Sequence, residues 1–236
     1  MNKVFIGFDP RQVLAYTVLQ TSIITRADKP VTISPLIFQQ LPLKRLGLTP
    51  FTWSRFLVPW LCDFHGWALF LDIDTYARDD IGGLFDLADE KHAVMVSKNK
   101  LAFEWASVML FNCGHPDNRK LTPEFVETAN KLHAISWTEN IGELPGEWNH
   151  LVGYDEPNPN AKLVHFTQGV PCWPETFESE FAEEWHNEAK AAFSAQPWAA
   201  LMGRSVHAKP VMERLAKQHG NGKSLPVEET PAGVAP

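Results

Sequence analysis

Short apolar runs alternate with a helical pattern over the first forty or so residues of the chain. Residues 4–8 (VFIGF) form an apolar run of strand length, and residues 30–38 form another that is rich in β-branched side chains. Between them, apolar side chains recur near a helical period over residues 12–24. A strand, a helix and a second strand in this order predict a parallel sheet with crossover helices.

The same pattern continues through the rest of the chain. Aromatic and apolar residues over 53–64 predict a helix that packs on the sheet. Further strands are expected over residues 68–71, 93–97, 108–111 and 162–166, and further helices over 123–132 and 176–193, the last capped by Thr176. Residues 143–154 contain Pro145 and Gly146 and are expected to form a loop. The expected class is α/β.

One predicted strand ends in two carboxylates. Residues 70–75 have the sequence FLDIDT, in which Asp72 and Asp74 point the same way if the backbone is extended. Two converging carboxylates are costly unless a cation lies between them. Hard oxygen ligands suit Mg²⁺ or Mn²⁺, and such an ion could also hold a phosphate or diphosphate. The alternative is a solvated acidic turn.

Composition limits the classes of function. The chain has 236 residues, of which 44% are hydrophobic and 21% charged, as expected for a globular protein with one full core. The net charge of −7 argues against broad binding to nucleic acid. No run reaches the length of a membrane span, and residues 1–9 resemble a strand more than a signal peptide. We therefore expect a cytoplasmic protein, with peripheral membrane contact at most.

Domain organisation follows from the same composition. Residues 1–218 are expected to form a single domain. Proline, glycine and acidic residues are frequent over 219–236, which predicts a disordered tail.

The three cysteines, Cys62, Cys113 and Cys172, are too few and too scattered for a disulfide framework, and they favour a reducing compartment. Cys62 with His65, and Cys113 with His115, could each supply half of a zinc site. The spacing is poor, and the chain contains no CxxC pair.

Several segments occur in an order that resembles the GT-A-fold, nucleotide-sugar-dependent glycosyltransferases of the family 8 type. They are residues 5–9, Arg55, LDID at 71–74, FNCG at 111–114, LPGEWN at 144–149, and HFTQGVPCW at 165–173. The ordered set spans roughly three quarters of the chain and is more specific than the D-x-D alone. The resemblance implies a GT-A-like mixed, mainly parallel sheet flanked by helices, with a Rossmann-like nucleotide-binding half.

The resemblance also implies roles for single residues. Asp72, Asp74 and His165 would bind Mn²⁺ or Mg²⁺, and Asp74 and Arg55 would act at the catalytic centre. The remaining implied contacts are Phe8 and Asp9 with the uracil or ribose, Asn112 and Gly114 with the transferred sugar, Trp148 and Asn149 with the acceptor side, and Gly169 with the donor through the late motif.

Strand ends supply a separate reason to group some of these residues. Asp9, Asp74, Asn112 and His165 each lie at or just after the end of a predicted strand. Binding sites in open α/β sheets lie beyond the carboxyl ends of the strands. We therefore expect these side chains at one edge of the sheet.

Two departures from the family pattern concern the donor. The late motif usually has a lysine before its proline and tryptophan, and this chain has Pro171 at the lysine position. Lys162, Lys98 or Lys100 could compensate. The family's D-Q-D is also missing from residues 135–140 (ISWTEN), so sugar specificity or turnover could differ from that of the family.

The expected activity is transfer of a sugar from a nucleotide diphosphate, with UDP as the expected nucleotide, to an acceptor hydroxyl, with retention. A degenerate, non-catalytic binder of nucleotide sugars or glycans is one alternative. A haloacid dehalogenase-like phosphatase is another, although Tyr76 stands where that group has threonine or valine.

Single residues also have simpler interpretations. His165 could be a structural histidine, Arg55 could pair with a surface carboxylate, and Asn112 could cap a turn. Trp148 could pack in the core instead of stacking on a sugar.

Overall fold

The computed structural model describes residues 1–99, 101–194, 196 and 201–218. The chain divides into two compact units, Met1–Phe193 and Ser194–Pro236, and each is described by itself. The first unit contains both sheets, and the second contains helix α7 (Ala208–Gln218). The expected tail over 219–236 lies outside the described residues, and a single domain over 1–218 stays a prediction.

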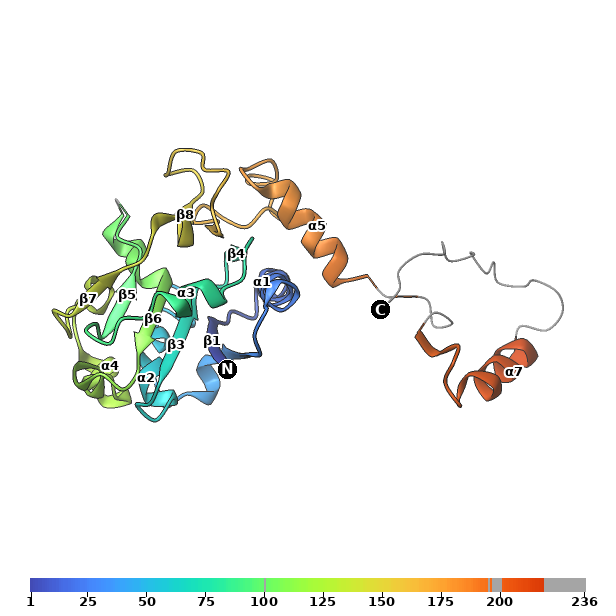
Figure 1. The fold of residues 1–236 in the computed structure, drawn as a ribbon, viewed down its shortest axis with the longest axis horizontal. Coiled ribbons are helices and arrows are strands. Elements are labelled where there is room, and N and C mark those ends of the chain that lie inside the picture. The colour runs from blue at the N-terminus through green and yellow to red at the C-terminus, as the bar shows by residue number, and fades with distance from the viewer. Residues whose placement is uncertain (100, 195, 197–200, 219–236) are drawn as a thin grey trace. The chain divides into compact units, whose positions relative to one another are not determined.

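A mixed sheet of six strands forms the centre of the first unit (Figure 1). In spatial order the strands are β2 (Val31–Leu36), β1 (Asn2–Gly7), β3 (Trp67–Leu71), β6 (Val108–Asn112), β5 (Val94–Val96) and β7 (Ile141–Glu143). Strand β6 runs antiparallel to both of its neighbours, and all other pairs are parallel. The expected α/β class with a mixed, mainly parallel sheet is confirmed.

The central strands are continuous apolar runs because both faces of the sheet are covered. Leu69, Phe70 and Leu71 of β3 are fully buried, as are Val108 and Phe111 of β6. Polar residues appear only where the strands end, so the ends of the strands are where chemistry becomes possible.

Helices flank the sheet. They are α1 (Val13–Arg26), α2 (Val58–Leu61), α3 (Gly82–Asp86), α4 (Pro123–Thr128) and α5 (Ala182–Ala192). Short 3₁₀ segments lie at η1 (Phe38–Gln40), η2 (Ser54–Leu57), η3 (Ala102–Ser107), η4 (Pro116–Lys120), η5 (Leu132–Ala134) and η6 (Gly146–Trp148). Among the described residues, no helix is long and apolar enough to cross a membrane.

Helix α5 begins later than the sequence pattern predicts. Thr176, the expected cap, donates its hydroxyl to the carbonyl of Val170. Phe181, directly before the helix, has φ of 62°, a left-handed conformation that cannot continue a right-handed helix. The expected helix over 176–193 is therefore wrong for its first six residues.

A second, three-stranded sheet has the order β4 (Thr75–Ala77), β9 (Leu163–His165) and β8 (His150–Leu151). Strand β8 lies inside the stretch that was expected to be a loop over residues 143–154, and that prediction is wrong for it. Both β4 and β8 are short, so their own side-chain patterns are too brief to distinguish them from loops.

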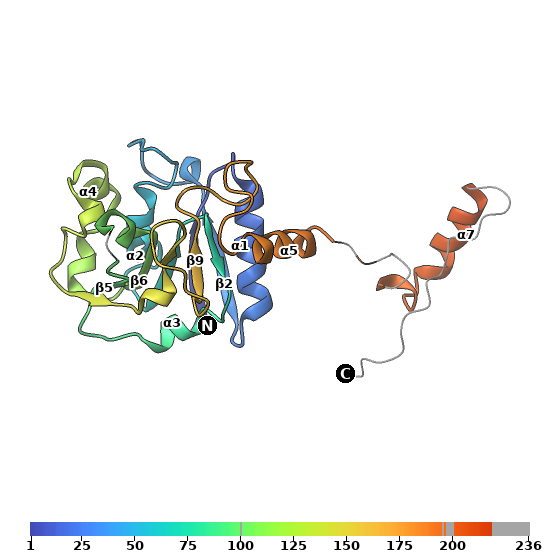
Figure 2. The same cartoon turned by 90° about the horizontal axis from the view of Figure 1, so that it is seen from above.

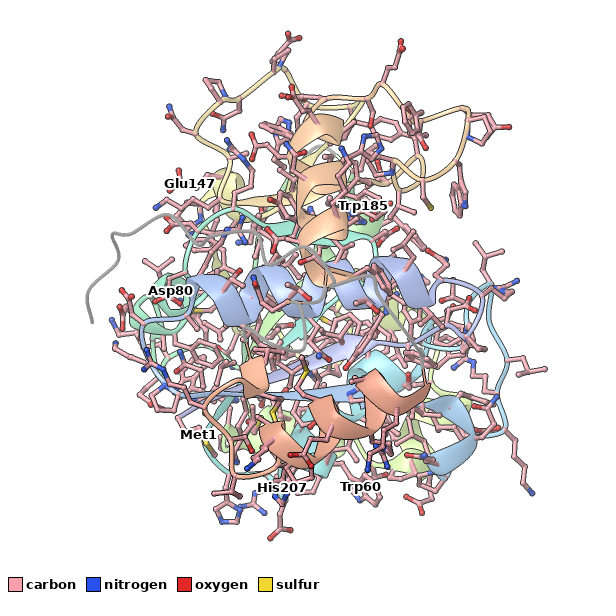
Figure 3. The ribbon with its side chains drawn as sticks, turned by 90° about the vertical axis from the view of Figure 1, so that its right-hand side faces the viewer. Met1, Trp60, Asp80, Glu147, Trp185 and His207 are labelled. Atoms are coloured by element: carbon pink, nitrogen blue, oxygen red, sulfur yellow. The ribbon has the colours of Figure 1, made fainter. Side chains whose placement is uncertain are left out.

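Helix α5 lies against α1 (Figure 2). Trp185 of α5, labelled in Figure 3, is 2% exposed and belongs to the core. On the same interface, Nη2 of Arg26 lies 2.8 Å from a Glu188 carboxylate oxygen and donates to the Tyr76 hydroxyl at 3.0 Å. These contacts join the second sheet, through β4, to α1 and α5.

Candidate metal centre and active site

Two acids and one imidazole converge where β3 ends. Asp72 and Asp74 follow Leu71, the last residue of β3, and β4 begins at Thr75, directly after Asp74. Because β4 pairs antiparallel with β9 in a register that places Thr75 opposite His165, the histidine lies beside Asp74. One ligand atom from each of Asp72, Asp74 and His165 lies within 4.8 Å of the others. The predicted convergence of these three side chains is confirmed.

Arg55 holds Asp72 from the protein interior. Its Nη1 donates to Oδ2 of Asp72 at 3.1 Å and to the carbonyl of Ala106 at 2.8 Å. Its Nη2 lies 3.0 Å from Oδ1 of Asp72, as an ion-pair contact without hydrogen-bond geometry. Arg55 is only 6% exposed, so the alternative of a surface ion pair is wrong.

Two carboxylate oxygens at this centre are buried and lack a hydrogen-bond partner: Oδ1 of Asp72 and Oδ1 of Asp74. A buried carboxylate oxygen without a partner is costly. A divalent cation would satisfy both oxygens at once, and an imidazole nitrogen would complete a ligand set that suits Mn²⁺ and Mg²⁺. The residues therefore fit a divalent cation.

Asn149 determines which nitrogen of His165 faces the acids. Its amide nitrogen donates to the carbonyl of Glu104 and to the hydroxyl of Ser107, both at 3.1 Å. Its Oδ1 is thereby turned toward Nδ1 of His165, 3.1 Å away, and must accept from an N–H there. Nε2, which lies 3.4 Å from Oδ1 of Asp74, is then the nitrogen available to a metal.

The acids and the imidazole perturb one another. Burial is the main cause that raises the pKa of Asp72, to about 7, and Asp74 adds to the rise while Arg55 opposes it. Burial by itself lowers the pKa of His165, but the charges of Asp74, Asp72 and Glu104 outweigh burial and raise it. A compact group of perturbed acids and bases at a strand end is typical of a functional site.

Glu104 and Ser107 belong to this centre, although the sequence analysis did not select them. Oε2 of Glu104 lies 4.0 Å from Nδ1 of His165, and its side chain is 20% exposed. The Ser107 carbonyl accepts from the backbone N–H of Asp72 at 2.9 Å. Both residues precede β6, and no motif in the sequence indicates them, because they approach the acids only when β6 pairs with β3.

Asn112 and Gly114 do not lie at this centre. Strand β6 is antiparallel to β3, and its last residue, Asn112, pairs with Trp67, the first residue of β3. Asp72 follows the other end of β3, which is roughly 13 Å away along the strand. The expectation that Asn112 shares an edge with Asp74 is therefore wrong, because the carboxyl end of an antiparallel strand lies at the opposite edge.

Phe8 and Asp9 follow β1, which is parallel to β3, so they lie on the same edge as Asp72. Asp9 is fully buried and accepts hydrogen bonds from the guanidinium and backbone N–H of Arg11. The Arg11 hydrogen bond is the main cause that lowers the pKa of Asp9. The side chain of Arg11 is 70% exposed, so this pair places a cation at the open edge.

Trp148 and Gly169 have structural explanations. The Trp148 ring is 3% exposed, and a Cβ on Gly83 would come within 2.9 Å of it, so the ring packs in the core. Stacking of this ring on a sugar does not fit such burial, and the alternative that Trp148 packs in the core agrees with it. Gly169 has φ of 123°, and a Cβ there would come within 2.5 Å of the Trp173 ring. Only glycine fits this bend after His165.

The lysines named as substitutes for the missing late-motif lysine have partners elsewhere. Nζ of Lys162 lies 3.0 Å from a Glu147 carboxylate oxygen, and Nζ of Lys98 lies 3.9 Å from Glu143. Lys100 lies outside the described residues.

The half-sites for zinc that the sequence allowed, despite their poor spacing, do not assemble within the described residues. Within the described part of the chain, the only group of three or more metal-ligating side chains is that of Asp72, Asp74 and His165. A zinc site made from the cysteines and their neighbouring histidines is therefore not found there.

Comparison with solved structures identifies the fold. The galactosyltransferase LgtC, solved in complex with donor and acceptor sugar analogues, superposes with a TM-score of 0.59 at 15% identity, over 84% of this chain and 99% of LgtC. The glycosyltransferase GlyE of Streptococcus pneumoniae TIGR4 gives 0.58 at 15% identity, over 86% of this chain and 63% of GlyE. The bifunctional glycosyltransferase WbbM gives a TM-score of 0.59 at 16% identity, over 90% of this chain and 51% of WbbM. These likenesses confirm the expected GT-A-like fold.

Sequence comparison gives a nearer relative. No protein-family model matches the chain. Protein CDI of Arabidopsis thaliana is 37% identical over an alignment of 222 residues, which covers 79% of this chain and 85% of the relative. At that identity and coverage, the chain belongs to the same family as protein CDI of Arabidopsis thaliana.

Proposed function

We propose that this chain is a metal-dependent glycosyltransferase of the hexosyl type. It transfers a sugar from a nucleotide diphosphate, UDP, to an acceptor hydroxyl, with retention at the anomeric carbon. The main support is one observation: Asp72, Asp74 and His165 converge at the end of β3, and each acid has a buried oxygen without a hydrogen-bond partner. The GT-A-like fold supports the same class of reaction.

The ligand set suits Mn²⁺ or Mg²⁺, held by Asp72, Asp74 and His165. When bound, the ion supplies positive charge that stabilises the departing diphosphate. The protein's own residues prepare the site. Arg55 keeps the Asp72 carboxylate in place, and Asn149 presents the free nitrogen of His165. Groups fixed in advance in this way need no reorganisation during the reaction.

The nucleotide is expected beyond the end of β1. Phe8 and Asp9 follow that strand on the metal edge and would contact the uracil and ribose. Arg11, bonded to Asp9 and largely exposed, provides a cation on the same edge. We propose that it supplies part of the positive charge that the missing late-motif lysine supplies in family 8 enzymes.

Retention would follow front-face attack of the acceptor without a covalent intermediate. An inverting enzyme would need a carboxylate base, for which Glu139 and Glu147 are the candidates in the loop-like stretches of the sequence. Glu139 is exposed, and Glu147 is paired with Lys162 at 3.0 Å. We propose instead that Glu104, whose Oε2 lies 4.0 Å from Nδ1 of His165, contacts the transferred sugar. A carboxylate there would stabilise positive charge that develops on the sugar.

The fold does not favour a haloacid dehalogenase-like phosphatase. A non-catalytic binder would share the donor site and differ in turnover, so the experiment below includes a turnover measurement. The three cysteines are free thiols, which agrees with the cytoplasmic location that we propose.

The test is binding and turnover of a panel of nucleotide sugars with and without Mn²⁺. We expect calorimetry to detect Mn²⁺-dependent binding of a UDP-linked donor, strongly weakened in Asp74→Ala. Asp28→Ala, which removes an exposed carboxylate on the segment before β2, is the matched control and should bind like the parent chain. Equal donor binding by Asp74→Ala and the parent chain at every metal concentration would contradict the proposed site. Binding without donor hydrolysis or transfer would indicate the non-catalytic binder.

A further inference from the structure

A cavity lies at the edge of the sheet opposite the metal centre, where β6 ends beside the start of β3. It has a volume of about 320 Å³, and small-molecule sites begin at about 300 Å³. Its lining includes Trp67, Glu90, Asn112, Gly114 and His115. We propose that this cavity is a sugar-binding site separate from the metal centre, and that it holds one sugar unit through the hydroxyl groups of that unit.

The pairing of two strands brings the walls of the cavity together. Trp67 begins β3 and lies opposite Asn112, the last residue of β6. Asn118 is fully buried and holds the turn after β6, because its amide donates to the carbonyl of Asn112 at 2.8 Å. The backbone N–H of His115 donates to the same carbonyl at 3.0 Å. The walls are therefore fixed by the fold itself.

Glu90 presents a carboxylate that is already held in place. Its Oε1 accepts from the indole N–H of Trp67 at 3.1 Å, and its Oε2 accepts from the amide of Asn112 at 3.0 Å. A carboxylate oxygen can accept a second hydrogen bond, so both oxygens retain capacity for a ligand. Because the side chain is held in advance, binding costs less rotamer entropy than it would at a free glutamate.

Two glycines keep the cavity open. A Cβ on Gly66 would meet no described atom within 4 Å. A Cβ on Gly114 would lie 3.7 Å from Oδ1 of Asn112, so this oxygen faces the space that a side chain at Gly114 would fill. Within the described part of the chain, Oδ1 of Asn112 accepts no hydrogen bond, and it is a further acceptor for a ligand.

His115 supplies a donor beside these acceptors. Its Nδ1 accepts from the backbone N–H of Asp117 at 3.2 Å, so the ring proton lies on Nε2. No other described residue accepts a hydrogen bond from Nε2. The cavity thus offers one N–H donor together with the carboxylate of Glu90 and the amide oxygen of Asn112.

This combination of donors and acceptors selects the class of ligand. The residues that line the cavity include no lysine or arginine, and the Glu90 carboxylate repels phosphates and other anions. An ammonium group only donates and would leave the N–H of His115 unpaired, which is costly. A hydroxyl group donates and accepts, so adjacent hydroxyls of one sugar ring satisfy both kinds of partner. The partly buried indole of Trp67 adds an apolar surface for the C–H face of the ring.

The test is an NMR titration of the full chain, without metal or nucleotide, with the methyl glycosides of glucose, galactose, mannose, xylose and N-acetylglucosamine. The chain has nine tryptophans, and the indole N–H signal of Trp67 is assigned by its loss in Trp67→Phe. We expect at least one glycoside to shift this signal. Asp74→Ala should bind that glycoside with the dissociation constant of the parent chain, so the result is independent of the function proposed for the metal centre.

Two variants test the contacts. In Gly114→Val the side chain occupies the cavity, and the atom nearest to the new Cβ is the Phe64 carbonyl oxygen at 3.6 Å, an ordinary contact. Glu90→Ala removes the carboxylate from an exposed residue. Each should weaken glycoside binding at least about tenfold, as expected for the loss of hydrogen bonds to a charged group. Glu156→Ala, which removes an exposed carboxylate elsewhere, is the matched control and should bind like the parent chain.

Circular dichroism verifies that each variant is folded. The proposal is overturned if no glycoside shifts the Trp67 signal, or if folded Gly114→Val or Glu90→Ala binds the glycoside as the parent chain does. It is equally overturned if methylammonium shifts this signal and no glycoside does, since the cavity would then be a cation site.

Discussion

Oδ1 of Asn149 lies 3.1 Å from Nδ1 of His165, and this contact fixes the orientation of the imidazole at the metal centre. The amide itself is fixed by its bonds to Glu104 and Ser107, so its oxygen can face only the histidine. Asn149 was expected at the acceptor side. The geometry instead supports a role as a positioning residue behind a metal ligand.

Asn149→Ala should weaken Mn²⁺ binding about 10- to 100-fold, because the ring of His165 loses the partner that fixes its orientation. Titration calorimetry of the purified chain measures the dissociation constant. Asn130→Ala, which removes an exposed amide, should leave it unchanged. A folded Asn149→Ala variant with the dissociation constant of the parent would show that the amide does not support the ligand.

Mn²⁺ affinity should rise as the pH increases from about 5.5 to 7.5. The metal needs deprotonated ligands, and the pKa values of Asp72, about 7, and of His165 are both raised in the metal-free chain. In the metal-free chain, the raised pKa of Asp72 contributes stability below its usual pKa of about 4, and this contribution is lost as the pH rises through about 7.

The measurement is calorimetry in two buffers of different ionisation enthalpy, which gives the number of protons released on Mn²⁺ binding. Asp72→Asn should release fewer protons than the parent chain. Affinity that stays constant between these pH values would contradict the ionisation states assigned to both residues.

Glu104→Gln should slow sugar transfer by at least about tenfold, since a carboxylate that faces developing positive charge stabilises the transition state. The substitution keeps the size of the side chain, and Mn²⁺ affinity should change much less than the rate. This prediction rests on the proposed function, and the measurement is the rate of transfer at saturating donor.

Asn112→Ala is the matched comparison for Glu104→Gln, because Asn112 lies at the other edge of the sheet and bonds to Glu90. Its rate should stay within about twofold of the parent. A large loss of transfer rate in Asn112→Ala, together with an unchanged rate in Glu104→Gln, would contradict this prediction. It would favour Asn112, as the sequence implied, over Glu104 as the residue that contacts the transferred sugar.

His133 should make the chain less stable as the pH falls. Burial is the main cause that lowers the pKa of this histidine to about 4, and its ring packs on Phe56 and Phe103. The unfolded chain binds a proton near pH 6.5, so the free energy of unfolding decreases as the pH falls from 6.5 to 4. Because His133 is partly exposed, the slope stays below about 1.4 kcal/mol per pH unit.

Urea unfolding at several pH values measures this slope. His133→Leu should reduce it, whereas His65→Leu, at a histidine whose side chain is 78% exposed, should not. If the free energy of unfolding changes with pH to the same extent in the parent and in His133→Leu, the imidazole of His133 is not held neutral by burial.

The sequence by itself determined the features that depend only on residues close together in the chain. The apolar runs of β1 and β3 and the helical period of α1 predict the α/β class, and the two acids after Leu71 predict a candidate metal site at the end of a strand. These patterns are local, because backbone geometry relates the side chains directly.

Only the tertiary structure decided which of these strand ends meet. The antiparallel direction of β6 moved Asn112 away from the acids and brought Glu104 to them, and the pairing of β9 with β4 delivered His165. A strand's own sequence does not specify its direction or its partner, since both depend on connections and packing across the whole sheet. For that reason the candidate ligands and Arg55 could be named from the chain, but the positioning role of Asn149 and the presence of Glu104 and Ser107 at this centre could not.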